Sequence, residues 1–171
     1  SSVGKAITSA ASADPDVVTV GVLYDDALAS ADPDALLAWI DNLIMQANNI
    51  YQGSGVNIAF SVVAINQYEP GASLSISDRL NVVSCGTANC NPLGSLNGAV
   101  DTWRNSVRAD LVVQLVGTGT GSTCGIGWIP PNGIPAEYLS FFTYSVSAVQ
   151  SGDGQACPSN VVAHEMGHNF S

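Results

Sequence analysis

The sequence predicts an α/β fold in which helices cover a largely parallel β-sheet. Residues 17–24, VVTVGVLY, form a nearly continuous β-branched and aromatic run, which is typical of a central strand covered on both faces. A helix pattern follows this run, and strand and helix patterns then alternate as far as residue 116. Strands that are joined by helical crossovers pair in parallel, and a chain of 171 residues is expected to form one domain.

The first helix is expected to begin directly after Asp32. This residue is a suitable N-cap, and Pro33 fits the first turn of a helix. Apolar side chains then recur at helical spacing, at Leu36, Ile40, Leu43, Ala47 and Tyr51. Gly53 and Gly55 are expected to end the helix.

The middle of the chain continues the alternation of strands and helices. Residues 56–65, VNIAFSVVAI, carry apolar side chains at every second position, which predicts a strand. A long polar connection with EPGAS and the first two cysteines is expected next. Residues 96–107 then have the apolar spacing of a helix, and residues 110–116, DLVVQLV, predict a further buried strand.

The last third of the chain is rich in turn-forming residues. The segment 118–135 is dense in glycine and proline around a short apolar core at residues 125–129, which predicts an exposed edge strand. Residues 138–149, YLSFFTYSVSAV, predict one more strand. Ser159 is expected to cap a final helix that contains both histidines of the chain.

Four cysteines, an even number without a Cys-x-x-Cys pair, favour disulfides over a zinc site built from thiolates. Three pairings are possible, and we favour a local Cys85–Cys90 loop, which leaves Cys124 with Cys157. This pairing predicts an oxidising compartment. The alternative is a cytosolic protein with four reduced, buried cysteines.

The net charge of the chain indicates which kinds of partner it is not expected to bind. The formal net charge is −10, from 14 acidic and 4 basic residues, which argues against nucleic acid and anionic membrane surfaces as partners. The chain has no run of about 18 apolar residues, as a membrane-spanning helix requires. It begins at Ser1, so we expect that any targeting segment has been removed.

The segment NVVAHEMGHNFS, residues 160–171, contains the candidate catalytic residues. Positions i and i+4 share one helix face, so His164 and His168 are predicted to present two imidazoles to one zinc ion. Glu165 is placed to reach a zinc-activated water and to act as general base. The pattern thus predicts metal-assisted hydrolysis. The alternative is that both histidines serve packing or solvation and that Glu165 is an ordinary exposed acid.

Most of the chain resembles the catalytic domains of the metzincins. Among these, it is most similar to the reprolysin-like (adamalysin-like) and bacterial peptidyl-Asp metalloendopeptidase-like proteins. The resemblance rests on segments that occur in the family's order, of which the last is the most specific: VTVGVLYDD, YQGSGVNIAFSVVAI, ADLVVQLV, TCGIGWI and ACPSNVVAHEMGHNFS.

This resemblance implies a secreted, zinc-dependent endopeptidase that acts on proteins or peptides. The implied α/β (α+β) zincin-type fold has a twisted, mixed, mostly parallel five-stranded sheet with an antiparallel edge strand, two covering helices and a C-terminal active-site helix. It implies that His164 and His168 bind zinc and that Glu165 is the general base. Gly125, Ile126 and Gly127 match the edge strand, which would bind a substrate peptide by strand addition.

The sequence departs from the family at its end. The extended pattern is His-Glu-x-x-His-x-x-Gly-x-x-His, but Ser171 stands where the glycine is expected, and the third histidine would lie beyond it. We therefore expect residues 1–171 to form the upper, N-terminal subdomain of a catalytic domain. A missing or separate C-terminal segment would supply the third zinc ligand and the lower subdomain.

Several alternatives remain open at this stage. The chain is an enzyme, a catalytically inactive peptide-binding module or fragment that retains the fold, or a structural secreted domain that binds no zinc. Asp25 and Asp26 are candidate calcium ligands, although a turn or helix-cap role is the commoner one for such residues. Arg104 and Arg108 are candidates for binding acidic substrate side chains, although a solvated helix face is the commoner role for two arginines one turn apart.

Overall fold

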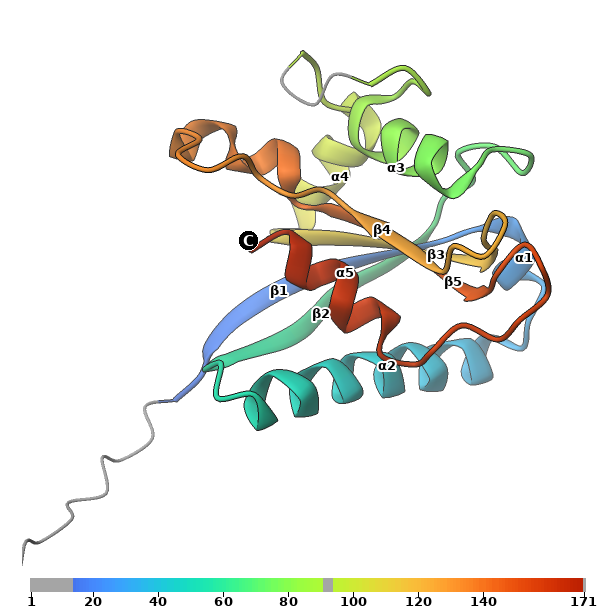
Figure 1. The fold of residues 1–171 in the computed structure, drawn as a ribbon, viewed down its shortest axis with the longest axis horizontal. Helices are drawn as coiled ribbons and strands as arrows, with labels where there is room; N and C mark the ends of the chain where they lie inside the picture. The colour runs from blue at the N-terminus through green and yellow to red at the C-terminus, as the bar shows by residue number, and fades with distance from the viewer. Residues whose placement is uncertain (1–13, 91–93, 171) are drawn as a thin grey trace, which may run out of the picture.

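The computed structural model of the protein describes residues 14–90 and 94–170. One five-stranded sheet has the order β2-β1-β3-β5-β4 (Figure 1). The strands are β1 (Asp16–Tyr24), β2 (Ile58–Gln67), β3 (Leu111–Thr118), β4 (Gly125–Gly127) and β5 (Tyr144–Gln150). Four strands run parallel, and β4 pairs antiparallel with β5. The mixed, mostly parallel sheet with an antiparallel edge strand is therefore confirmed.

Helices cover both faces of this sheet (Figure 1). They are α1 (Asp26–Ala29), α2 (Pro33–Gly53), α3 (Ile76–Cys85), α4 (Gly98–Val107), the 3-10 helix η1 (Ala136–Phe142) and α5 (Val161–His168). The long helix α2 and the C-terminal helix α5 pack on one face, and α3 and α4 pack on the other. The sheet is thus the middle layer between two hydrophobic cores.

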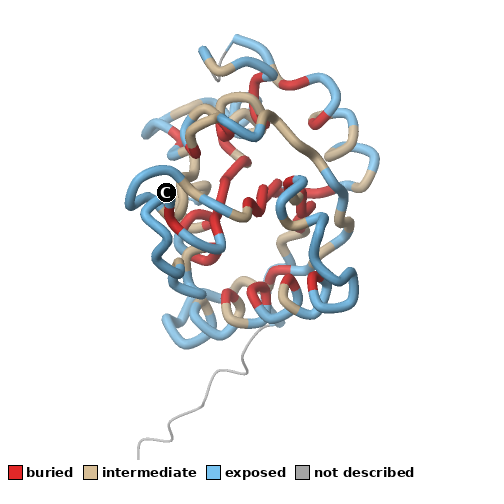
Figure 2. The backbone as a smooth tube through the Cα atoms, turned by 90° about the vertical axis from the view of Figure 1, so that its right-hand side faces the viewer, coloured by how far each residue is buried: buried red, intermediate tan, exposed pale blue. Residues whose placement is uncertain are grey.

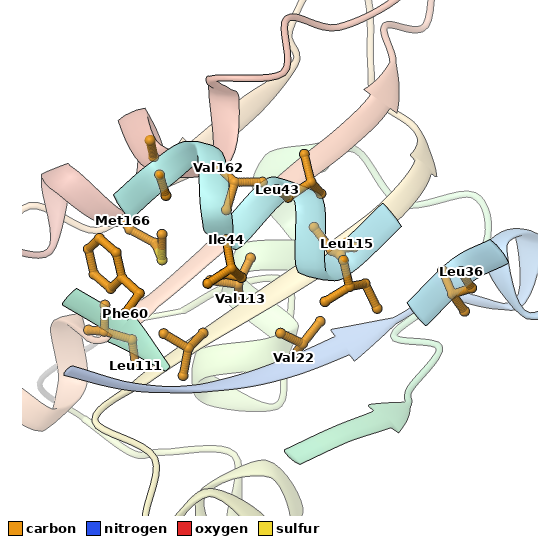
Figure 3. Close-up of a cluster of buried hydrophobic side chains, with 14 residues drawn as sticks. Val22, Leu36, Leu43, Ile44, Phe60, Leu111, Val113, Leu115, Val162 and Met166 are labelled. Atoms are coloured by element: carbon orange, nitrogen blue, oxygen red, sulfur yellow. The ribbon is translucent and has the colours of Figure 1, made fainter. Parts of the chain in front are cut away.

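The first core lies between the sheet and helices α2 and α5 (Figure 3). Alternate side chains of β1 and β3 enter it because successive residues of a strand point to opposite faces. Its central members are Val20, Val22, Ile40, Leu43, Ile44, Leu111, Val113, Leu115, Val162 and Met166. Burial is concentrated on the sheet and on the helix faces turned toward it (Figure 2). Helix α5 is therefore anchored by its apolar face.

The second core fills the opposite side of the sheet with the other set of alternating side chains. Its fully buried members are Leu80, Val83, Val112, Val116, Tyr144 and Val146. Helix α4 comes close to β1 here, since a Cβ atom on Gly21 would lie 2.8 Å from Cη2 of Trp103. A larger residue at Gly21 would therefore force Trp103 to shift where α4 packs on β1.

The predicted start of α2 is confirmed by its cap. The Asp32 carboxylate accepts a hydrogen bond from the Ala35 amide, and Pro33 occupies the first turn. The end of the helix at Gly53 is confirmed as well. Burial of Leu36, Ile40, Leu43 and Ala47 follows the predicted helical spacing.

The structure corrects the sequence-based elements at three places. Residues 76–85 form helix α3 in place of a polar connection, so three long helices rather than two cover the sheet. Residues 136–142 form η1, so β5 begins only at Tyr144. Asn160 rather than Ser159 precedes the first residue of α5.

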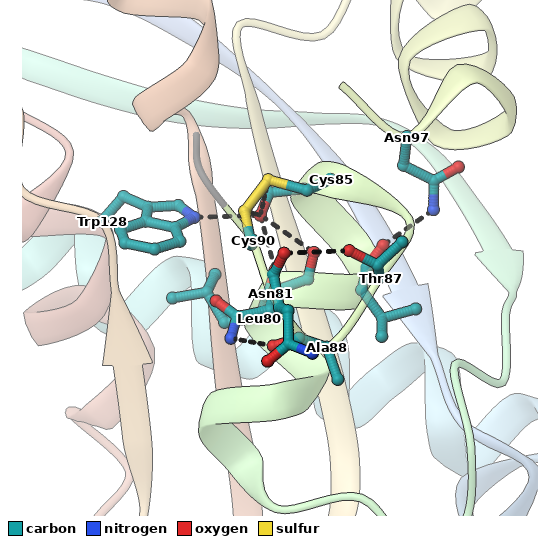
Figure 4. The surroundings of a disulfide bond; sticks show 11 residues. Leu80, Asn81, Cys85, Thr87, Ala88, Cys90, Asn97 and Trp128 are labelled. Atoms are coloured by element: carbon teal, nitrogen blue, oxygen red, sulfur yellow. Dashed lines mark hydrogen bonds between the residues drawn. A yellow bond between two sulfur atoms is a disulfide. The ribbon is translucent and has the colours of Figure 1, made fainter. Parts of the chain in front are cut away.

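Both expected disulfides, Cys85–Cys90 and Cys124–Cys157, are present. The first closes a loop at the end of α3 and lies beside Trp128, whose Nε1 donates a hydrogen bond of 3.0 Å to Ser84 Oγ (Figure 4). The Ser84 hydroxyl lies within 3.8 Å of both sulfur atoms.

Across residues 14–90 and 94–170, no helix has both the length and the apolar character needed to cross a bilayer.

Candidate metal centre

Helix α5 brings the two histidines together on its exposed side. The rings of His164 and His168 are 4.7 Å apart between centroids and nearly perpendicular, with an interplanar angle of 79°. Val162 and Met166 lie on the other side of the helix and are buried in the first core. The amphipathic pattern of the helix therefore fixes which side chains face outward.

Glu165 lies next to the histidines but points toward the sheet edge. It is only 5% exposed, and its Oε2 atom is 3.9 Å from Nε2 of His168. Burial raises the pKa of the Glu165 carboxyl above its ordinary value, and the nearby His164 partly opposes this shift. The carboxylate is thus poorly hydrated and correspondingly more basic.

The edge strand β4 packs directly on the α5 helix. A Cβ atom on Gly125 would lie 2.5 Å from Oε1 of Glu165. A Cβ atom on Gly127 would lie 2.5 Å from the Glu165 carbonyl oxygen and 3.3 Å from Cβ of His168. Only glycine allows this approach of strand and helix, so the structure brings the predicted strand residues Gly125 and Gly127 against the predicted catalytic helix.

Strand β4 directs its remaining backbone groups away from the sheet. The Cys124 carbonyl accepts a hydrogen bond from the Ala148 amide, and the Trp128 amide donates to the Tyr144 carbonyl. Because alternate residues of an antiparallel strand bond to the same neighbour, the amide and carbonyl groups of Gly125 and Gly127 point outward. In the described part of the chain, no strand pairs with this outer side of β4.

The Cys124–Cys157 disulfide joins the two elements of the site. Cys124 directly precedes β4, and Cys157 lies in the segment that leads into α5. The two Cα atoms are 5.5 Å apart, although the residues are separated by 33 positions in the sequence. The start of β4 and the segment that leads into α5 are therefore covalently linked.

A pocket of about 410 Å³ lies on the other flank of α5, toward the end of α2. His164, His168 and Gly167 line it from α5, and Tyr51 lines it from α2. The Tyr51 hydroxyl donates a hydrogen bond of 3.3 Å to the Ala163 carbonyl. Tyr51 was assigned from its spacing only to the core face of α2, because its contact with α5 spans 112 positions of the sequence.

The other charged candidates have structural contacts. Asp25 is buried, caps α1 through the Leu28 amide, and lies 3.7 Å from Nη1 of Arg79, which confirms the helix-cap role. Asp26 accepts a hydrogen bond from Gln67. Arg104 donates to the Ser140 carbonyl and to the Thr143 hydroxyl and so anchors η1, whereas Arg108 ends α4 at an exposed position.

The donor atoms of α5 suit a zinc ion, but they do not complete its coordination. Neutral imidazole nitrogens are common zinc ligands, and a catalytic zinc usually has three protein ligands. Within the described residues, no group of three His, Cys, Asp or Glu side chains is arranged to hold a metal ion. This part of the chain therefore contributes two imidazoles and a neighbouring carboxylate.

The five-stranded sheet and its helices have the architecture of the zincin-type fold that the sequence predicts. A family model for metallo-peptidase family M12 matches residues 14–171. The chain therefore belongs to this family and is a reprolysin-like metzincin, that is, a member of a group of zinc-dependent peptidases. The family that the sequence resembles is therefore confirmed.

A solved structure confirms the fold independently. It is described as "Structure of a chaperone-substrate complex" and matches with a TM-score of 0.68 at 16% sequence identity. The match covers 92% of this chain and 26% of the other, so this chain spans about a quarter of the length of that protein. No curated protein matches the chain.

Proposed function

We propose that the protein is a secreted zinc-dependent endopeptidase in which His164 and His168 bind zinc and Glu165 is the general base. The observation that carries this proposal is the position of Glu165. Its buried carboxylate lies between the exposed histidine pair and an open strand edge. A base, a pair of metal ligands and a peptide-binding edge thus meet at one place.

The catalytic roles follow from the surroundings of each residue. When bound, zinc polarises the scissile carbonyl as a Lewis acid and lowers the pKa of water to about 7. Glu165 takes the proton of the attacking water and passes it to the leaving amine. Its raised pKa favours the first of these transfers, because a more basic carboxylate accepts a proton more readily.

Strand β4 would hold the substrate by adding a strand to the sheet. The outward backbone groups of Gly125 and Gly127 supply hydrogen bonds to an extended peptide, and Ile126 between them points into the second core. Because Gly125 also contacts Glu165, a peptide paired here has its backbone next to the general base. The strand therefore orients the scissile bond.

The described residues would form the upper part of the catalytic domain. A third protein ligand and the floor of the cleft would come from outside them, from another segment or a separate chain. Two disulfides support an oxidising, extracellular location. The competing function is an inactive peptide-binding module, which would use the same strand edge without hydrolysis.

The test combines zinc titration with cleavage of an unstructured protein substrate. Wild-type protein, assayed together with the segment or chain that supplies the third ligand, is expected to take up one zinc per chain and to gain cleavage that a chelator abolishes. Glu165→Gln should retain zinc and lose about 100-fold or more of the cleavage rate. His164→Ala and His168→Ala should lose zinc, while Glu137→Gln, an exposed change in η1, should behave as wild type.

Each alternative gives a different result. Zinc uptake without cleavage, when the segment or chain that supplies the third ligand is present, would favour the peptide-binding module. No zinc uptake by the wild type would overturn the metal site. Full cleavage by Glu165→Gln would remove this residue from the mechanism and leave the metal assignment intact.

A further inference from the structure

Asn169 connects the end of helix α5 to the neighbouring edge of the sheet. Its Nδ2 atom lies within hydrogen-bond distance of three backbone carbonyl oxygens, those of Trp128 at 3.0 Å, Phe142 at 2.7 Å and Tyr144 at 3.2 Å, which share its two N–H groups. All three partners are acceptors, so the amide nitrogen and not the amide oxygen faces them. One side chain thus joins segments that lie 25 to 41 positions away in the sequence.

These three carbonyls belong to the two segments that flank the candidate site. Trp128 directly follows β4, while Phe142 and Tyr144 lie at the end of η1 and the start of β5. The Trp128 amide also donates to the Tyr144 carbonyl. The Asn169 amide therefore sits at the junction where the substrate-pairing strand leaves the sheet.

Helix α5 has a particular need for such an anchor near His168. It contains only eight residues, and helices shorter than about 12 residues are marginal in water without tertiary contacts. His168 is the last residue of the helix. Beyond it, the backbone closes with short-range bonds, from the Asn169 amide to Met166 and from the Phe170 amide to Gly167. A helix end of this kind frays readily unless a side chain holds it.

We propose that Asn169 is a positioning residue that holds His168 in place against β4, through the backbone and without touching the metal. The inference rests on the proposed zinc site but adds a residue that no metal-binding pattern requires. Loss of the carboxamide would free the last turn of α5, so that His168 would have to be ordered each time zinc binds. Zinc affinity would then fall by more than the loss of fold stability explains.

The test uses Asn169→Ala with Asn48→Ala as the matched control. Asn48 is also half-buried and also joins two elements through its amide, donating to the Phe60 carbonyl and accepting from the Phe60 amide, but on β2. Both variants should lose a similar free energy of unfolding in urea. In competition with a chromophoric chelator, only Asn169→Ala should weaken zinc binding, by about tenfold.

Amide hydrogen exchange of the metal-free protein supplies a second readout. Exchange at His168 and Asn169 should be at least about tenfold faster in Asn169→Ala than in wild type, and unchanged in Asn48→Ala. Equal zinc affinities of the two variants, or unchanged exchange in Asn169→Ala, would overturn the proposal. If the wild type binds no zinc, the proposed function fails, whereas the exchange data still decide whether Asn169 holds the helix end.

Discussion

At the scale of single residues, the candidate site depends on two positions that lack a side chain. Gly125 and Gly127 let β4 lie directly against Glu165 and His168 of α5. At Gly127 the obstacle to a larger residue is the Glu165 carbonyl, which belongs to the helix backbone and cannot rotate away. The distance between the edge strand β4 and helix α5 is thus set by glycine.

Gly127→Ala is therefore expected to destabilise the protein by about 1–3 kcal/mol, the usual range for an overpacked position. Urea unfolding measures this change. Gly53→Ala is the control, because nothing in the described structure lies within 4 Å of a Cβ atom there, and it should be neutral or slightly stabilising. Equal stability of the two variants would show that strand and helix separate easily.

The residues of the site differ in how well the sequence predicts them. His164, Glu165 and His168 are close in sequence, so helical spacing alone brings them together, as the structure shows. Asn169 and Tyr51 give no such signal, because their partners are at least 25 positions away. Their contacts depend on the packing of whole elements, which local patterns do not encode.

At the scale of elements, β4 and α5 behave as one unit. They share the Cys124–Cys157 disulfide, the glycine contacts and the Asn169 hydrogen bonds. The Cys85–Cys90 disulfide, by contrast, closes a loop of five positions that directly follows α3. The Cys124–Cys157 disulfide closes the longer loop and therefore restricts the unfolded chain more strongly.

Replacing both cysteines of a pair by serine tests this difference. Chain-entropy arithmetic gives a loss of about 4 kcal/mol for the 33-position loop and about 2 kcal/mol for the five-position loop. Cys124→Ser with Cys157→Ser should therefore lower the unfolding midpoint more than Cys85→Ser with Cys90→Ser. The reverse order would mean that the α3 loop holds more of the native structure than its length suggests.

Elements with strong periodicity or clear caps were predictable, and the missed ones have identifiable causes. Helix α2 has a cap, a proline and five buried residues at helical spacing. Helix α3 has the same spacing at Ile76, Leu80 and Val83, but polar residues around them resemble a loop. In η1, the apolar run looks like a strand, whereas hydrogen bonds from the distant Arg104 hold the backbone in a 3-10 turn.

At the scale of the whole molecule, the alternation of strands and helices predicted a parallel sheet, and glycine and proline predicted an edge strand. The antiparallel direction of this edge strand came from the family resemblance. The strand order β2-β1-β3-β5-β4 did not follow from local patterns, since it depends on how the two cores fill. The second core is centred on Tyr144, which is fully buried. Burial raises the pKa of Tyr144 to about 12, and Arg104 partly opposes this shift.

Tyr144 is expected to set the alkaline limit of the fold. An unfolded tyrosine loses its proton near pH 10, so the unfolded state holds fewer protons than the folded state between pH 10 and pH 12. The contribution of Tyr144 to the free energy of unfolding is fully present below pH 10 and falls by about 3 kcal/mol as the pH rises to 12. Tyr144→Phe should lack this fall in urea unfolding, while the exposed-site control Tyr138→Phe should keep it.

The brevity of β4 has a consequence for the behaviour of the protein in concentrated solution. The unpaired N–H and C=O groups of an open sheet edge can form hydrogen bonds with the edge of an identical molecule, which is a common route to aggregation. Here the edge is three residues long, two of them are glycine, and Pro130 and Pro131 follow shortly after. Such an edge offers too few hydrogen bonds to join two folded molecules stably, so β4 is protected from pairing with the sheet of a second molecule.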